Sequence, residues 1–283
     1  MGGSCGVIGA YLYEQSTSSP HPFWCIVIPL LASIIGSTLA ALIYSFLTIT
    51  LRANQNVTGL ALTTFGVGFG DFFGGSMTKI FSEGGNLSVK TTADYFKTSL
   101  PIADKLGWFG EIFLSYGFLA YLAVIIAFLT AWFLKKTKAG LHLRAVGENP
   151  ATADAAGINV TKYKYLATCI GGAIAGLGGL YFIMDYTGGS WTSGGFGDRG
   201  WLAIALVIFA LWKPNMGILG SFVFGGLYIA YTYISGLSRS AIAIFNMLPY
   251  IVTIVVLILT SVRDKKENQP PQSLGLAYFR EER

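Results

Sequence analysis

Residues 135–165 read KKTKAGLHLRAVGENPATADAAGINVTKYKY and form the longest polar, basic interruption between two strongly apolar runs. Within this segment the sequence marks both ends of a short helix. Asn149 is a good N-cap, Pro150 suits the first helical position, and Gly157 suits the left-handed residue after the last turn. The pattern predicts a helix over Pro150–Ala156, about 10 Å long.

The interior of this predicted helix consists of small side chains, namely Ala151, Thr152, Ala153, Asp154, Ala155 and Ala156. Such a helix has no bulky apolar stripe to bury in its own protein, so it can fit closely into a groove on another protein. The alternative is a solvated connector with one helical turn, because short alanine-rich helices are marginal on their own and common in loops. The residues alone leave both interpretations open.

The composition indicates an integral membrane protein. Of the 283 residues, 53% are hydrophobic and only 12% are charged, whereas ordinary globular domains carry about 25% charged residues. The 36 glycines are typical of membrane helices whose backbones approach closely. The net charge of +5 comes from basic residues beside apolar runs, which favours membrane anchoring over nucleic-acid binding.

Apolar runs separated by polar loops make up the rest of the chain. Long runs that can span a bilayer cover residues 23–51, 108–134, 166–187, 216–234 and 241–262. Residues 1–13 are apolar but too short to span. Two further short runs, residues 60–73 and 201–212, have glycines at or before their ends. They point to a transport path between two halves, although tilted packing helices or re-entrant segments would give the same pattern.

The distribution of lysine and arginine predicts the orientation. If residues 135–165 are cytoplasmic and each run crosses once, most basic residues fall on the cytoplasmic side, and the outer basic residues are diluted by acidic ones. This layout predicts seven crossings plus a partial N-terminal one. Residues 1–262 then form the transmembrane domain, residues 74–107 an outer polar loop, and residues 263–283 a cytoplasmic tail.

The sequence contains no catalytic constellation. There are two histidines and three cysteines, none with metal or redox spacing, so we expect neither a metal site nor a cofactor. No GxxxxGK[ST] loop is present to cradle ATP phosphates, and any energy from ATP must therefore come from a partner protein.

Polar and aromatic residues at membrane depth are the candidates for a substrate path, because an unpartnered polar group there is costly. They are Asn54, Gln55, Asp71, Phe72, Asp185, Trp191 and Asn246. The aromatic members can stack on a base or sugar ring. The alternatives are headgroup contacts for the aspartates, interface anchoring for the aromatics, and a bridge between two helices for Asn246.

The stretch Arg144-Ala145-Val146-Gly147-Glu148-Asn149-Pro150-Ala151, followed by Ala155-Ala156-Gly157-Ile158, resembles the cytoplasmic coupling loop of permease subunits of bacterial ABC importers. The family serves branched-chain amino acids, ribose and other simple sugars, and nucleosides. Residues 51–55, 59–62 and 195–197 also resemble it, and Ser273-Leu274-Gly275 with residues 278–283 looks most like nucleoside permeases. The family pattern usually begins with a further hydrophobic helix, so we expect this sequence to start inside that pattern.

The resemblance implies an all-α, multi-pass permease of the bacterial cell membrane, with broken or short helices near the midplane, and not an enzyme. It implies three partners: an ABC ATPase subunit, a second, paralogous permease, and an extracellular or periplasmic substrate-binding protein. The substrate would be a nucleoside or simple sugar, with ribose-like sugars or branched-chain amino acids as alternatives. An ion-coupled secondary transporter is the rival of another class, but it would need an intramembrane acid or histidine relay.

The same resemblance implies that a coupling helix docks on the ATPase. The residues expected there are Arg144, Gly147, Glu148, Asn149, Pro150, Ala151, Asp154, Ala155 and Gly157. Glu148 and Asp154 would meet basic residues of the ATPase, and the small residues would permit close approach. Arg144 would orient the loop or contact phospholipid headgroups.

Overall fold

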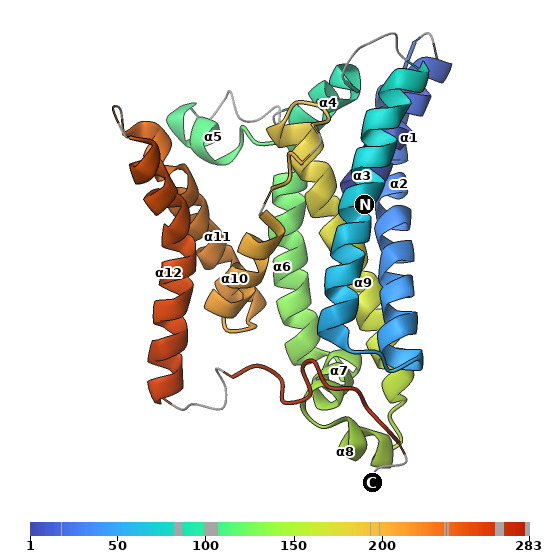
Figure 1. The fold of residues 1–283 in the computed structure, drawn as a ribbon, viewed down its shortest axis with the longest axis vertical. Helices are drawn as coiled ribbons and strands as arrows, with labels where there is room; N and C mark the ends of the chain where they lie inside the picture. Colours follow the sequence, from blue (N-terminus) through green and yellow to red (C-terminus); the bar gives the residue numbers. More distant parts are fainter. Residues whose placement is uncertain are drawn as a thin grey trace. The chain divides into compact units, whose positions relative to one another are not determined.

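The computed structural model describes residues 1–17, 19–81, 87–98, 107–192, 194–197, 199–234, 236, 238–263 and 269–280. In these residues every regular element is a helix (Figure 1), apart from one isolated bridge between Ser88 and Ser190. The chain divides into two units. Unit 1 comprises Met1–Ala123, Pro150–Gly195 and Gly275–Arg283, and unit 2 comprises Val124–Asn149 and Phe196–Leu274.

Unit 1 contains most of the N-terminal half. Its helices are α1 (Gly2–Ser16), α2 (Pro22–Ser45) with the π-helical turn η1 (Phe46–Thr50), α3 (Gln55–Phe81), α4 (Lys90–Lys97), α5 (Gly107–Phe113), α8 (Pro150–Ala155), and α9 (Val160–Tyr181) with the π-helical turn η3 (Phe182–Tyr186). Helix α6 (Phe118–Lys136) contributes residues to both units. Unit 2 also contains α7 (Lys138–Glu148), α10 (Arg199–Phe209), α11 (Pro214–Ile229), the 3₁₀ turn η4 (Ala230–Tyr233) and α12 (Arg239–Arg263).

The core of unit 1 is the α2–α9 seam, formed by Ser33, Ser37 and Ala41 of α2 and Gly172 and Gly176 of α9. The spacing of four residues puts each set on one helix face. Oγ of Ser33 donates to the carbonyl oxygen of Gly176 at 2.9 Å. A Cβ added at Gly172 would lie 2.5 Å from Cβ of Ala41. The small residues therefore allow the two backbones to approach closely, as in many membrane helix pairs.

Helix α1 packs along the same pair through glycines of its own. A Cβ added at Gly2 would lie 2.5 Å from Cα of Gly176, and one added at Gly3 would lie 2.7 Å from the carbonyl oxygen of Gly179. Figure 1 shows α1 beginning beside the middle of α9 and running toward the end that carries α4. Its 15 residues fall short of the ~20 that a spanning helix needs, in agreement with the sequence analysis.

Five helices of the described residues are long and apolar enough to cross a membrane: Pro22–Thr50, Phe118–Lys136, Val160–Tyr186, Pro214–Tyr233 and Ser240–Ile258. Helix α10 is apolar but short, with 11 residues. The all-α, multi-pass architecture predicted from the sequence is confirmed, and the short apolar run predicted over residues 201–212 overlaps α10, which starts two residues earlier.

The prediction of a short run over residues 60–73 is wrong in extent, since α3 is a continuous helix of 27 residues. It begins just after Asn54, whose side-chain oxygen accepts from the backbone N–H groups of Asn56 and Val57 at 3.0 and 3.1 Å. Glycines inside a helix cost only about 1 kcal/mol each, so those in α3 do not break it. The helix extends into the predicted polar loop of residues 74–107, which also contains α4.

The prediction of one span over residues 108–134 is also wrong. Helix α5 ends at Phe113 and α6 starts at Phe118. Gly117 lies between them and is pressed against a neighbour, because a Cβ there would lie 2.5 Å from the carbonyl oxygen of Phe96. In addition, α7 makes residues 138–148 helical, where the sequence analysis expected only one short helix in the whole segment 135–165.

Candidate functional site

Helix α8 has the ends that the sequence predicts, to within one residue. Gly157 has φ +83°, and two hydrogen bonds close the helix around it. The N–H of Ile158 donates to the carbonyl of Ala153, and the N–H of Gly157 donates to that of Asp154, both at 3.0 Å. This pair of bonds is a Schellman motif, which satisfies carbonyls at the end of the helix.

The small residues of α8 differ in their exposure. Ala153 is 3% exposed and packs within unit 1. Ala155, Ala156 and Gly157 are exposed. The outward face of α8 therefore carries no side chain larger than a methyl group at these three positions.

Asp154 points into unit 1. Its Oδ2 accepts a hydrogen bond from Oη of Tyr278 at 3.0 Å and from Nε of Arg280 at 3.1 Å. The Asp154 side chain is 14% exposed, whereas that of Arg280 is 74% exposed. The carboxylate is thus engaged by the C-terminal tail of the same chain, and the sequence analysis had no signal for this partner.

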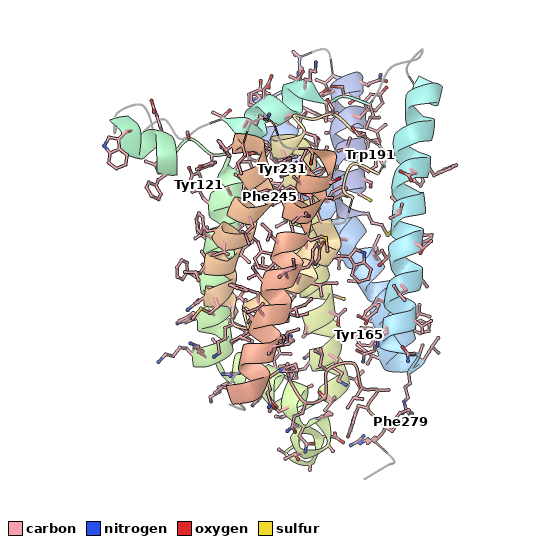
Figure 2. The ribbon with its side chains drawn as sticks, turned by 60° about the vertical axis from the view of Figure 1, so that its left-hand side comes forward. Tyr121, Tyr165, Trp191, Tyr231, Phe245 and Phe279 are labelled. Atoms are coloured by element: carbon pink, nitrogen blue, oxygen red, sulfur yellow. The ribbon has the colours of Figure 1, made fainter. Side chains whose placement is uncertain are left out.

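Residues 275–280, which we call the tail strap, also contact the junction of η1 and α3. Nε2 of Gln55 donates to the carbonyl of Leu276 at 3.3 Å. The guanidinium of Arg52 lies 4.7 Å from the ring centroid of Phe279. Figure 2 shows Phe279 at the same end of unit 1 as Tyr165 of α9. The tail strap therefore links α8 to the ends of α2 and α3.

A cavity of about 710 Å³ lies beneath the tail strap. All of its lining residues belong to unit 1, and they come from the η1–α3 junction, the α8–α9 turn and the tail strap. They are Thr48, Ile49, Arg52, Gln55, Asp154, Gly157, Ile158, Asn159, Val160, Thr161, Lys162, Lys164, Ala277, Tyr278 and Arg280.

In unit 2, the preceding part of the tail holds the end of α7. The backbone N–H of Ser273 donates to the carbonyl of Gly147 at 3.1 Å, and its hydroxyl donates to the carbonyls of Val146 and Gly147. A Cβ added at Gly147 would lie 3.6 Å from Cβ of Pro271. The last turn of α7 exposes Arg144 and Glu148, so these two charged side chains face solvent.

The predicted path residues of unit 1 fall at different levels. Asn54 caps α3, and Gln55 lines the cavity beneath the tail strap. Trp191 lies toward the opposite end (Figure 2), where its ring packs on glycines 70 and 74 of α3. Asp71 and Phe72 lie on α3 between those glycines, and both are exposed. Asp185 belongs to η3 and lies beside Gly117.

Asn246 lines a smaller cavity of about 180 Å³ within unit 2. The guanidinium of Arg199 in the same wall lies 5.6 Å from the ring centroid of Tyr228. Tyr250, one helical turn after Asn246 on α12, completes the polar lining. The sequence analysis missed Arg199, Tyr228 and Tyr250, although the i, i+4 spacing of Asn246 and Tyr250 and the position of Arg199 just before a short apolar run were visible signals.

A family model described as the permease component of the branched-chain amino acid transport system matches residues 1–257. This chain belongs to that permease family. The permease is thus a transport component and not an enzyme, as the sequence analysis expected, and the ion-coupled rival is set aside.

Relatives of this permease include NupQ, a guanosine ABC transporter permease of Bacillus subtilis, which is 32% identical over 91% of this chain and 79% of its own length. NupC, a nucleoside ABC transporter permease of Lactococcus lactis subsp. cremoris, is 30% identical over 82% of this chain and 73% of its own. TsgC13 of Haloferax volcanii, provisionally named a glucose ABC transporter permease, is 35% identical over 67% of this chain. The chain spans 55% of TsgC13. No solved structure matches.

Proposed function

We propose that this permease conducts a nucleoside through the bacterial cell membrane during ATP-driven import, and that α8 docks on a separate ATPase subunit. The observation that carries the docking role is the exposed small-residue face of Ala155, Ala156 and Gly157. A 6-residue helix with such a face adds little to the stability of its own unit. It offers a partner a closely approachable surface, whose ends are fixed by Pro150 and by the Schellman motif at Gly157.

The polar residues of the coupling segment take different roles in this proposal. Arg144 and Glu148 are exposed on the last turn of α7, so they are available for charged contacts with the ATPase. Asp154 instead holds α8 to the tail strap, and Gly147 accepts the tail at Ser273. The tail thereby orients both parts of the coupling segment, while the small residues make the contact. The remaining coupling residues, Asn149, Pro150 and Ala151, set the start of α8.

For the substrate, we take nucleosides first because NupQ and NupC are named for guanosine and nucleosides. The unit 2 cavity supports this choice, since Asn246, Arg199, Tyr228 and Tyr250 combine hydrogen-bonding groups with aromatic faces. A nucleoside presents hydroxyls, base edges and a flat ring to such a surface. Simple sugars are the second candidate because TsgC13 is named for glucose, and branched-chain amino acids come third.

The rest of the assembly follows from an importer of this kind. A second, related permease would complete the path, and an extracellular or periplasmic binding protein would deliver the substrate. The charge bias supports a cytoplasmic location for α7, α8 and the tail. ATP binding and hydrolysis in the partner would move α8 and alternate access to the path.

The test is uptake of labelled guanosine, ribose and leucine by cells that express the permease with its neighbouring ATPase, second permease and binding protein. We expect guanosine uptake that stops when ATP is depleted. Unlabelled ribose and leucine should not compete with it. ATP-dependent uptake of ribose or leucine, with none of guanosine, would contradict the nucleoside assignment. Guanosine uptake that persists without ATP would contradict the energy coupling.

A further inference from the structure

The cavity beneath the tail strap lies at the end of two membrane spans. Thr48 and Ile49, in its wall, belong to the last turns of the span Pro22–Thr50, and Val160 and Thr161 open the span Val160–Tyr186. Hydroxyls of Thr50 and Tyr165 are hydrogen-bonded at 2.5 Å between the same helices. One span ends and the other begins at this level, so the cavity lies where the bilayer meets water.

The lining of this cavity carries more positive than negative charge. Arg280 is paired with Asp154, the one carboxylate among the described lining residues. Three further cations, Arg52, Lys162 and Lys164, also line the cavity. Arg52 and Lys164 lie over the rings of Phe279 and Tyr278, and these contacts position the cations without neutralising them.

The backbone adds to the preference for an anion. The first turn of α9 lines the cavity through Val160 and Thr161. The first N–H groups of a helix have no partner within that helix and carry the positive end of its dipole. The side chain of Asn159 accepts from the N–H of Lys162, which fixes this turn beside the three cations.

We propose that this cavity binds the phosphodiester headgroup of an anionic phospholipid. Basic pockets beside membrane helices recognise such headgroups, and Arg52 brings a fork of donors suited to phosphate oxygens. Apolar walls from Ile49 and Ile158 favour a lipid over free phosphate, because its glycerol and acyl chains can continue along the adjoining spans.

The bound lipid would stabilise the tail strap, since Arg52 and Lys164 contact both the cavity and the rings of the strap. Through Tyr278 and Arg280 the lipid would thereby hold α8 in place. If the orientation under Proposed function holds, the lipid belongs to the cytoplasmic leaflet, but the headgroup chemistry does not depend on that orientation. If no lipid binds, the lipid proposal fails, but the nucleoside and ATP-coupling assignments are still decided by the uptake experiment.

The test uses the purified full-length permease in detergent, with dioctanoyl phosphatidylglycerol as probe and dioctanoyl phosphatidylcholine and inorganic phosphate as comparisons. We expect selective binding of phosphatidylglycerol, measured by native mass spectrometry and calorimetry. Lys162→Gln, at an exposed side chain, should weaken binding roughly five-fold, and Lys162→Gln with Lys164→Gln roughly 25-fold.

The matched control is Lys135→Gln with Lys136→Gln, because these lysines end another span and do not line the cavity. Its affinity should equal that of the unchanged permease. Three outcomes would overturn the proposal: equal binding of both lipids, an equal loss in the control variant, or displacement of the lipid by inorganic phosphate at similar concentration. Circular dichroism checks that each variant keeps its helical content.

Discussion

The α2–α9 seam and helix α8 are both rich in small residues, but these residues are covered in the seam and partly exposed on α8. In the seam, Ser33 is 0% exposed and the small faces of both helices are covered by each other. On α8, Ala153 is covered but Ala155 is exposed, as is Ala156 directly after the helix. Small residues permit close helix approach in both places. In the seam the partner helix lies within the chain, whereas the function proposed for α8 requires a partner outside it.

This difference gives the two regions different sensitivities. A larger side chain in the seam must displace a backbone or a buried hydroxyl, so it should damage folding. Ala155 of α8 is exposed, so a larger side chain there should leave folding intact and hinder only the approach of a partner.

The largest effect is expected for Gly176→Leu. Any Cβ at this position would overlap Oγ of Ser37, and overpacking typically costs about 1–3 kcal/mol or more. We expect loss of folded protein, measured as the yield of monodisperse protein after extraction and its melting temperature. The matched control is Gly178→Leu on the same helix, where an added Cβ meets nothing within 4 Å. Equal yields for the two variants would mean that the seam is not closely packed.

The next effect is expected for Ala155→Trp. The indole would occupy the exposed face of α8 and prevent close approach, so ATP-dependent uptake and capture of the ATPase in a pull-down should both be lost. The yield and melting temperature should be unchanged. Thr91→Trp adds the same bulk to an exposed position of α4, at the other end of unit 1 (Figure 1), and should leave ATPase capture normal. Normal uptake by Ala155→Trp would contradict the proposed docking of α8 on the ATPase.

A smaller effect is expected when the tail strap is released from α8. The Arg280 side chain is largely exposed, and such ion pairs contribute about 0–1 kcal/mol. Asp154→Asn and Arg280→Gln should each reduce uptake by a modest factor without affecting the yield. Their combination should cost no more than Asp154→Asn alone, because Arg280→Gln removes an ion pair that Asp154→Asn has already removed. Additive losses would show that the two side chains act independently.

The smallest effect is expected for a labelling experiment that reports on which side of the membrane α7 lies. A cysteine introduced by Lys138→Cys at the start of α7 should react with an impermeant maleimide only after the cells are opened, and uptake should stay normal. Thr91→Cys on α4 is the matched control and should react in intact cells. Labelling of Lys138→Cys from outside would reverse the proposed orientation.

Local signals made part of this architecture predictable. Asn149, Pro150 and Gly157 lie at the ends of α8 and are close together in the sequence, so helix propensity and capping were sufficient to predict this helix. For the seam, the glycine content predicted close helix packing in general. The sequence did not indicate which helix covers Gly172 and Gly176. The extent of α3 was misjudged because Gly66, Gly68 and Gly70 suggested a break, whereas the helix continues through all three and Gly70 packs against the ring of Trp191.

The contacts that orient the candidate site were not predictable. Tyr278 and Asp154 lie 124 residues apart, and no local sequence pattern indicates that the two residues pair. The break between α5 and α6 was hidden for a related reason. Gly117 lies in an apolar run whose hydropathy does not change there, and its role depends on contact with the carbonyl of Phe96.

The distance along the chain between Asp154 and Tyr278 also sets an order of events during synthesis. At about 5–20 residues per second, the ribosome needs roughly 6–25 s to translate the intervening residues. During that interval α9, α10, α11 and α12 emerge, while Asp154 has not yet met Tyr278 or Arg280. Helix α8 is therefore anchored only after all of the later helices have been made, so a chain that stalls before the tail lacks these two bonds.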